Sequence, residues 1–232
     1  MITVLDIGEV SVDVVFKDIK NVHLSVYPPT GRIRISAPSR MTLDNVRLFA
    51  ISKLGWIKKQ RGKLLSQERE PAREFLERES HYVWGRRYLL RLEVGNPAVE
   101  LGHRDMVLRA DGDSPPERRR DLLEEWYRRE MRMAVAPLVR KWESALDIHV
   151  SRFFIQRMKT KWGSSNPVRR TIRLNLELAK KPPECLDYIV LHEMLHFIVP
   201  NHSTRFQALL DENQPGWRHL RQVLNESPLL YN

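Results

Sequence analysis

The segment His192–His202 constrains this chain more than any other part of its sequence. It reads HEMLHFIVPNH, with two histidines four positions apart, a glutamate after the first, and a third histidine six positions after the second. Residues i and i+4 share one face of a helix, so the imidazoles of His192 and His196 can reach one metal ion. Glu193 then points near the open position of that ion, where a general base must lie. The segment predicts a helix that carries a catalytic zinc site.

His202 is the predicted third ligand. Its offset from His196 is that of the third histidine in the longer HExxHxxGxxH motif, although Val199 replaces the glycine of that motif. Three neutral imidazoles leave the fourth position of zinc to water, which is typical of a catalytic site. If His202 is not a ligand, Asp211 and Glu212 are the nearest alternatives. The remaining histidines are interpreted as ordinary residues: His23, His81, His103, His149 and His219.

The motif indicates hydrolysis. Zinc lowers the pKa of its bound water toward ~7 and polarises the oxygen of the scissile carbonyl or phosphoryl group. We expect Glu193 to deprotonate that water and to deliver the proton to the leaving group. The loop KTKWGSS at 159–165 supplies the candidate substrate or oxyanion contacts Lys161, Trp162 and Ser164, because basic and hydroxyl residues suit the wall of an active site. A β-turn with a packed Trp162 is the alternative interpretation of this loop.

The composition is that of a globular protein with a strong positive charge. The 232 residues are 42% hydrophobic and 29% charged, which is enough for one large domain or two small ones. No secretory signal or membrane span is expected from the sequence. The single cysteine, Cys185, fits a cytoplasmic protein, and its expected role is helix packing. The net charge of +10 attracts anions, so nucleic acid or a DNA-bound protein is a predicted partner beside a peptide or protein substrate.

The pattern of apolar and turn residues predicts two regions. Residues 1–114 are expected to form a β-rich N-terminal region with one long basic helix over 43–68. The boundary falls in the turn formers Asp111–Pro116. Residues 115–232 are the predicted catalytic domain, which opens with a helix over 117–146. The other predicted strands are 12–17, 23–28, 31–38, a pair over 81–94, one near 105–109, 150–158 and 171–176, and the other predicted helices are 184–198, 204–211 and 217–225.

These motifs resemble the YgjP-like metallopeptidase family, which is grouped with the SprT-like zinc peptidases. The resemblance rests on LDYIVLHEMLHFIVPNHSTRF, on the preceding MKTKWGSSN and IRLNLEL, and on the pair Trp56-Ile57 in the basic helix. It implies an α+β fold, in which a zincin-like catalytic domain places its active-site helix on a small antiparallel sheet and a β-rich N-terminal region is attached. It also implies His192, His196 and His202 as zinc ligands and Glu193 as the catalytic acid and base.

Two positions depart from the family pattern. Ser165 stands where the family usually has cysteine, and Gln207 stands where it often has tryptophan. Neither is a predicted ligand, so the predicted function remains a cytoplasmic zinc metallopeptidase. One alternative is a metal-dependent nucleoside triphosphate (UTP) pyrophosphatase, an activity also proposed within the family. A three-histidine site argues against it, because phosphoryl-transfer enzymes more often hold Mg²⁺ through carboxylates. The other alternative is a basic DNA-associated adaptor, suggested by the charge.

Overall fold

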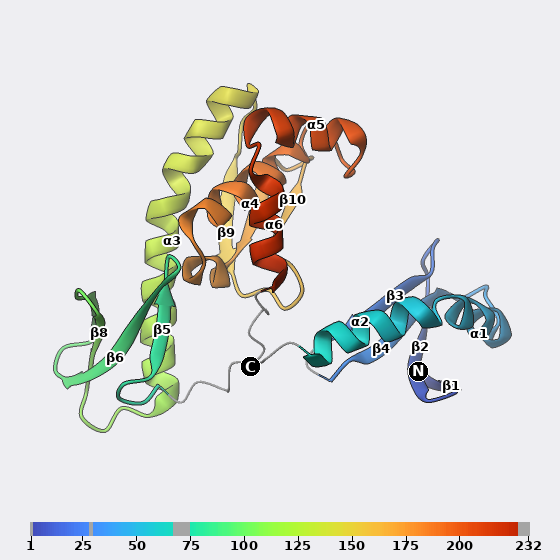
Figure 1. Cartoon of the computed structure of the whole chain (residues 1–232), viewed down its shortest axis with the longest axis horizontal. Coiled ribbons are helices and arrows are strands. Elements are labelled where there is room, and N and C mark those ends of the chain that lie inside the picture. The colour runs from blue at the N-terminus through green and yellow to red at the C-terminus, as the bar shows by residue number, and fades with distance from the viewer. Residues whose placement is uncertain (1, 28–29, 67–74, 227–232) are drawn as a thin grey trace. The chain divides into compact units, whose positions relative to one another are not determined.

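The computed structural model describes residues 2–27, 30–66 and 75–226, and the chain forms two compact units that divide after Arg69 (Figure 1). The strands of the first unit are β1 (Ile2–Ile7), β2 (Val10–Lys17), β3 (His23–Tyr27) and β4 (Arg32–Pro38), and its helices are α1 (Leu43–Ser52) and α2 (Leu54–Ser66). The strands of the second unit are β5 (Ser80–Val83), β6 (Arg86–Val94), β7 (Ala98–Leu101), β8 (Asp105–Ala110), β9 (Arg152–Gln156), β10 (Gly163–Asn166) and β11 (Thr171–Asn175). Its helices are α3 (Pro116–Leu146), the 3₁₀ helix η1 (Leu176–Lys180), α4 (Pro183–Leu195), α5 (Thr204–Asn213) and α6 (Trp217–Glu226).

The first unit is a four-stranded mixed sheet with two helices. Its strand order is β1-β2-β4-β3, in which β2 and β4 are parallel and the outer pairs are antiparallel. The inner face of the sheet shares a core with Val46, Ala50 and Ile57 of the helices. These four strands lie within residues 1–114, which the sequence predicted to be β-rich. Residues 28, 67 and 68, which ended two predicted elements, lie outside the described residues.

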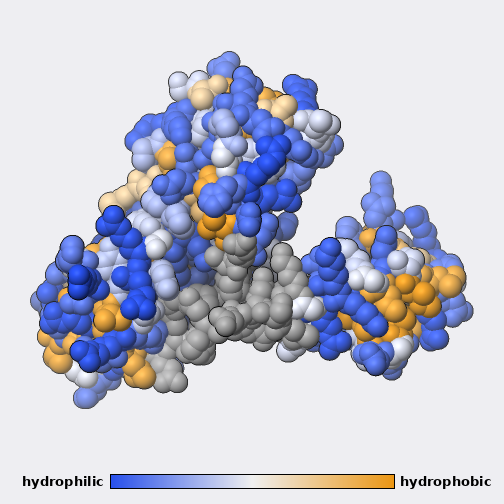
Figure 2. Space-filling view, in the orientation of Figure 1, coloured by the Kyte–Doolittle hydropathy of each residue, from blue (hydrophilic) through white to orange (hydrophobic). Residues whose placement is uncertain are grey.

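The predicted long helix over 43–68 is instead two helices. The hydroxyl of Ser52 donates to the carbonyl of Phe49, and the backbone N–H of Lys53 bonds to the carbonyls of both Phe49 and Ala50. Such competing bonds tighten the last turn and end α1 at Ser52, and α2 begins at Leu54. Figure 2 shows apolar surface among the hydrophilic side chains of this unit. Among the side chains of the two helices that the structure describes, the large exposed apolar ones are Leu43, Leu48, Ile51 and Trp56.

The second unit contains both the predicted catalytic segment and the sheet that the sequence placed in the N-terminal region. The predicted boundary between 114 and 115 lies inside it, because α3 packs on the sheet β5-β6-β8-β7. Leu90 and Met106 of that sheet share one core with Leu123 and Met131 of α3. The turn formers at Asp111–Pro116 therefore join β8 to α3 and do not separate two domains.

Helix α3 also holds α4, the helix of the predicted zinc motif, in place. The indole N–H of Trp142 donates to Asp187 on α4 at 2.6 Å, and Lys141 pairs with the same carboxylate at 2.7 Å. At the sheet β5-β6-β8-β7, the hydroxyl of Tyr127 on α3 donates to the carbonyl of Tyr82 on β5 at 2.7 Å. One long helix thus fixes both sheets and α4 within this unit (Figure 1). Among the helices of the described ranges, none has the length and apolar character needed to cross a membrane.

The sheet beside α4 is mixed, which corrects the predicted small antiparallel sheet. Its order is β10-β11-β9, with β10 antiparallel to β11 and β11 parallel to β9. The chain leaves β9, crosses to the outer position to form β10, and returns by a hairpin into the central position. Strand β11, which the chain forms on its return, therefore runs parallel to β9. Strand β10, with the sequence GSSN, was predicted as loop because it lacks the β-branched and apolar residues that mark strands.

Candidate active site and metal centre

Helix α4 carries the first two histidines of the motif. Pro183 lies in its first turn, where a missing backbone N–H costs nothing. The helix ends at Leu195, three residues earlier than predicted, but His196 keeps helical dihedral angles of φ −66° and ψ −12°. The rings of His192 and His196 therefore remain on one face, with centroids 5.0 Å apart. The predicted i,i+4 relation survives the early end of the helix.

The turn after α4 brings the third histidine back to the first two. The ligand nitrogens of His192, His196 and His202 all lie within 4.8 Å of one another. The Nε2 atoms of His192 and His202 are 3.0 Å apart. The Nδ1 atom of His196 lies 3.2 Å from the carbonyl of Val199, so an Nδ1–H there leaves Nε2 free for a metal. The structure thus brings together the three histidines that the sequence predicted.

The donor set of this cluster fits a zinc ion. It consists of imidazole nitrogens, which suit zinc and other borderline transition metals better than they suit Mg²⁺ or Ca²⁺. A ligating imidazole must be neutral. Burial lowers the pKa of His192 to about 3, helped by the neighbouring His196 and His202, and burial also lowers the pKa of His196. Both side chains are therefore ready to bind a cation at neutral pH.

The ring of Phe206 on α5 packs against all three imidazoles. Its ring centroid lies 5.0 Å from that of His192, 4.7 Å from that of His196 and 4.9 Å from that of His202. The side chain is 1% exposed, so the rings rest on a fixed apolar surface. The sequence prediction did not give Phe206 a role. The sequence feature that could have identified Phe206 is its position four residues after His202, at the start of the next helix.

Glu193 is buried beside the cluster, with 5% of its surface exposed. Burial raises the pKa of its carboxyl to about 7, while a hydrogen bond from Ser165 and the charge of Lys161 oppose the shift. A carboxyl with a pKa near neutrality can both accept and release a proton, as an acid and base catalyst must. Ser165, the departure from the family pattern, thus contacts the predicted catalytic group.

Gly163 makes room for this carboxylate. A Cβ atom on Gly163 would lie 2.6 Å from Oε1 of Glu193 and 2.8 Å from its Cγ. Strand β10 can therefore pass close to α4 only because this position has no side chain. The sequence prediction placed Gly163 in a basic loop and did not connect it with Glu193.

The cluster and Glu193 open into one cavity of about 750 Å³. Lys161, Trp162 and Ser164, the predicted substrate contacts, all line it. The cavity is also lined by Tyr188 of α4 and by Arg221 of α6. The alternative ligand Asp211 instead accepts a hydrogen bond from the indole of Trp217 at 2.8 Å and pairs with Arg218. Among the described residues, neither Asp211 nor Glu212 belongs to the group of side chains that could hold a metal ion.

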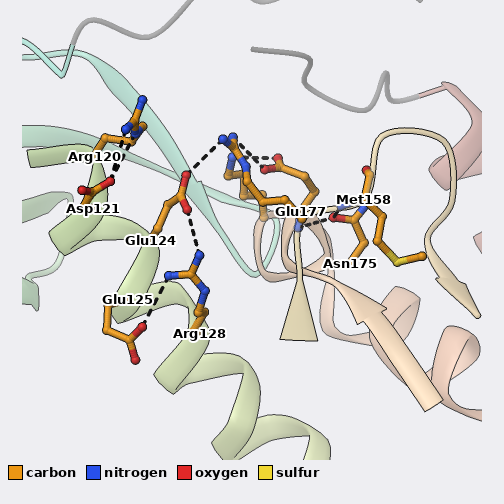
Figure 3. Close-up of polar contacts among 10 residues, drawn as sticks. Arg120, Asp121, Glu124, Glu125, Arg128, Met158, Asn175 and Glu177 are labelled. Carbon is orange, nitrogen blue, oxygen red and sulfur yellow. Dashed lines mark hydrogen bonds and ion pairs between the residues drawn. The ribbon is translucent and has the colours of Figure 1, made fainter. Parts of the chain in front are cut away.

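Asn175, at the end of β11, holds the wall that contains Lys161. Its side-chain amide donates to the carbonyls of Met158 and Lys161, both at 2.8 Å. Its side-chain oxygen accepts from the backbone N–H groups of Met158 at 3.3 Å and Glu177 at 3.2 Å (Figure 3). The residue is fully buried, so these bonds fix the chain from β9 to β10. Asn175 explains part of the IRLNLEL motif, to which the sequence prediction gave no function.

A small ion-pair network supports the same wall. Arg157 pairs with Glu124 of α3 at 3.0 Å and with Glu177 at 3.6 Å, and Lys180 pairs with Glu177 at 2.7 Å. Glu177 is 5% exposed, and a carboxylate at that depth needs such partners. Figure 3 shows Glu124 and Glu177 facing each other across this network. The loop after β9 is thereby tied to α3 as well as to β11.

Three imidazoles and a buried carboxylate at one cavity define the class of the protein, which is that of the metal-dependent hydrolases. The family model described as YgjP-like, metallopeptidase domain, matches residues 20–227. The chain belongs to the YgjP-like metallopeptidase family, as the resemblance of its motifs predicted.

Solved structures include a similar protein from an archaeon. The chain is 27% identical to the metallopeptidase zymogen of Methanocaldococcus jannaschii jannalysin, with a TM-score of 0.36, over 39% of this chain and 87% of that chain. None of the curated proteins compared with the chain matches it.

Proposed function

We propose that the protein is a zinc-dependent peptidase of the cytoplasm, with a zincin-like catalytic domain. His192, His196 and His202 hold the zinc ion in this proposal, and Glu193 is the general base. The observation that carries it is the buried carboxylate of Glu193, which lines the same cavity as the three imidazoles. The cytoplasmic location is supported by the single, buried cysteine, Cys185.

When bound, zinc supplies Lewis-acid polarisation of the scissile carbonyl and lowers the pKa of a water molecule toward ~7. Glu193 takes the proton from the attacking water and passes it to the leaving amine. In the metal-free protein, burial raises the pKa of this carboxyl to about 7. Lys161 and Ser164, on the cavity wall, are the candidate donors to the oxygen on which charge develops.

An extended peptide fits this site better than a compact ligand does. In the described part of the chain, β10 is the outer strand of its sheet, and its residues 163–166 line the cavity at Gly163, Ser164 and Ser165. An outer strand offers unpaired backbone N–H and C=O groups, to which an extended peptide can add as a further strand. The cavity wall therefore favours a peptide or protein substrate.

The second candidate is the nucleoside triphosphate pyrophosphatase. Lys161 and Arg221 in the cavity favour it, because cations there can hold phosphate groups. The imidazole donor set argues against it, for the reason given above. Nucleic acid or a DNA-bound protein stays a predicted partner from the net charge of +10.

A turnover assay on one protein preparation tests these proposals. Metal-free protein is reloaded with zinc or with magnesium and given either an unfolded protein, with and without DNA, or a panel of nucleoside triphosphates. The expected result is zinc-dependent proteolysis that chelator abolishes. Release of pyrophosphate without any proteolysis would replace the peptidase by the second candidate.

A further inference from the structure

The cavity beside the histidine cluster has an excess of positive charge. Among its described lining residues, Lys161 and Arg221 carry fixed positive charges, and Glu193 is the carboxylate. Any bound metal ion adds to this positive field. A cavity with such a field attracts anions and repels cations.

The two cations come from different parts of the fold. Lys161 directly precedes Trp162 and β10, and Arg221 lies on α6. Both β10 and α6 contact α4, which carries His192 and Glu193 at the base of the cavity. A ligand that reaches Glu193 therefore has cationic side chains available on more than one wall.

Arg221 lines the cavity, and its side chain is exposed. In the described ranges, its guanidinium has no ion pair within 4.0 Å, whereas Arg218 on the same helix is paired with Asp211. Burial raises the pKa of the Tyr188 hydroxyl, and the charge of Arg221 opposes that shift. Arg221 thus acts on Tyr188, the cavity residue one helical turn before His192.

We propose that Arg221, with Lys161, forms an anion subsite that selects peptides with a carboxylate near the scissile bond. The carboxylate is an acidic side chain or the C-terminal carboxylate of the substrate. A guanidinium binds a carboxylate through two parallel hydrogen bonds, which gives orientation as well as affinity. This proposal rests on the peptidase function proposed above. Phosphate shares the same chemistry, so nucleotides form a separate arm of the test.

The test compares substrates that differ in one charge. A peptide that the zinc-loaded enzyme cleaves is made with Glu, Gln or Lys at each position around the scissile bond, and with a free or amidated C-terminus. At one of these positions, or at the C-terminus, the peptide that carries the carboxylate is expected to have a kcat/KM about 10-fold higher than its uncharged counterpart. This is the effect of about one charge-assisted hydrogen bond. Arg221→Gln should reduce that ratio toward one, and Arg221→Glu should favour the lysine peptide.

Arg218→Gln is the matched control. It removes the same charge from the same helix, but Arg218 is not a lining residue of the cavity, so the preference should remain. A wild-type ratio near one at every position and at the C-terminus would overturn the proposal. So would a preference that Arg221→Gln leaves intact, since the anion would then be held elsewhere.

The subsite and the peptidase function fail in different ways. Cleavage without any charge preference refutes the subsite and leaves the peptidase. Hydrolysis of UTP that depends on Arg221, without peptide cleavage, refutes the peptidase and places phosphate in the subsite. Fluorescence anisotropy of a labelled acidic peptide on zinc-loaded Glu193→Gln measures binding without turnover. Loss of this binding in Glu193→Gln/Arg221→Gln supports the subsite, and equal binding with or without Arg221 contradicts it.

Discussion

Substitution of Gly163 by alanine should displace the carboxylate of Glu193, the proposed general base. The new Cβ atom would lie 2.6 Å from Oε1, 2.8 Å from Cγ and 3.0 Å from Cδ of Glu193, whereas ordinary contacts begin at 3.4 Å. The carboxylate must therefore move by about 0.8 Å, and a misplacement of about 1 Å can cost ~100-fold in rate. We expect kcat for peptide cleavage to fall by about 30- to 100-fold, with a loss of stability of about 1–3 kcal/mol.

The assay separates this displacement from a general loss of structure. Steady-state kinetics on one peptide are measured beside the metal content and the urea unfolding curve of each variant. Gly62→Ala is the control, because its Cβ would meet nothing within 4 Å. In a Glu193→Gln background, Gly163→Ala should cause little further loss of rate, since both changes act on one group. A Gly163→Ala enzyme with wild-type kcat would refute the reasoning.

Three further predictions concern buried groups. Asn175→Ala removes the side chain that bonds to Met158 and Lys161. KM should therefore rise, and the free energy of unfolding measured in urea should fall by about 3 kcal/mol, with metal content unchanged. An unaltered KM would contradict the positioning role of Asn175. Because burial raises the pKa of Glu193 from 4.5 to about 7, its ionised form destabilises the metal-free fold, and stability is lost as pH rises through this window. Glu193→Gln should therefore raise metal-free stability by about 3 kcal/mol at pH 8 and by nothing at pH 4, and equal gains at both would count against this view. Burial raises the pKa of Cys185 to about 11, so mass spectrometry should find iodoacetamide labelling at pH 8 only after unfolding, not in the native protein.

The local features of the site were predictable from the sequence. The spacing of His192 and His196 depends only on helix geometry, and His202 follows after a short turn. These residues and Glu193 therefore converge as expected, and Lys161 joins them on the cavity wall. The apolar periodicity of residues 117–146 gave the position of α3, whereas that of residues 43–68 did not show the break between α1 and α2.

The features that were missed depend on contacts between distant segments. Gly163 matters because β10 passes close to α4, and Arg221 matters because α6 packs beside the cavity. No local pattern records either contact. The sequence Asp111–Pro116 marks a turn, but turn formers do not distinguish a turn inside a unit from a linker between units. The mixed sheet results from the crossing between β9 and β10, and a connection of that kind leaves no periodicity.

The most direct test of the central proposal is peptide cleavage by zinc-loaded wild-type protein and Glu193→Gln at equal metal content. Cleavage products are followed by mass spectrometry, and bound zinc is measured in the same samples. Since Glu193 is the proposed general base, the variant should bind zinc normally and cleave about 100- to 10,000-fold more slowly. Equal cleavage by both proteins would contradict the role of Glu193, and absence of cleavage by zinc-loaded wild type would contradict the peptidase itself.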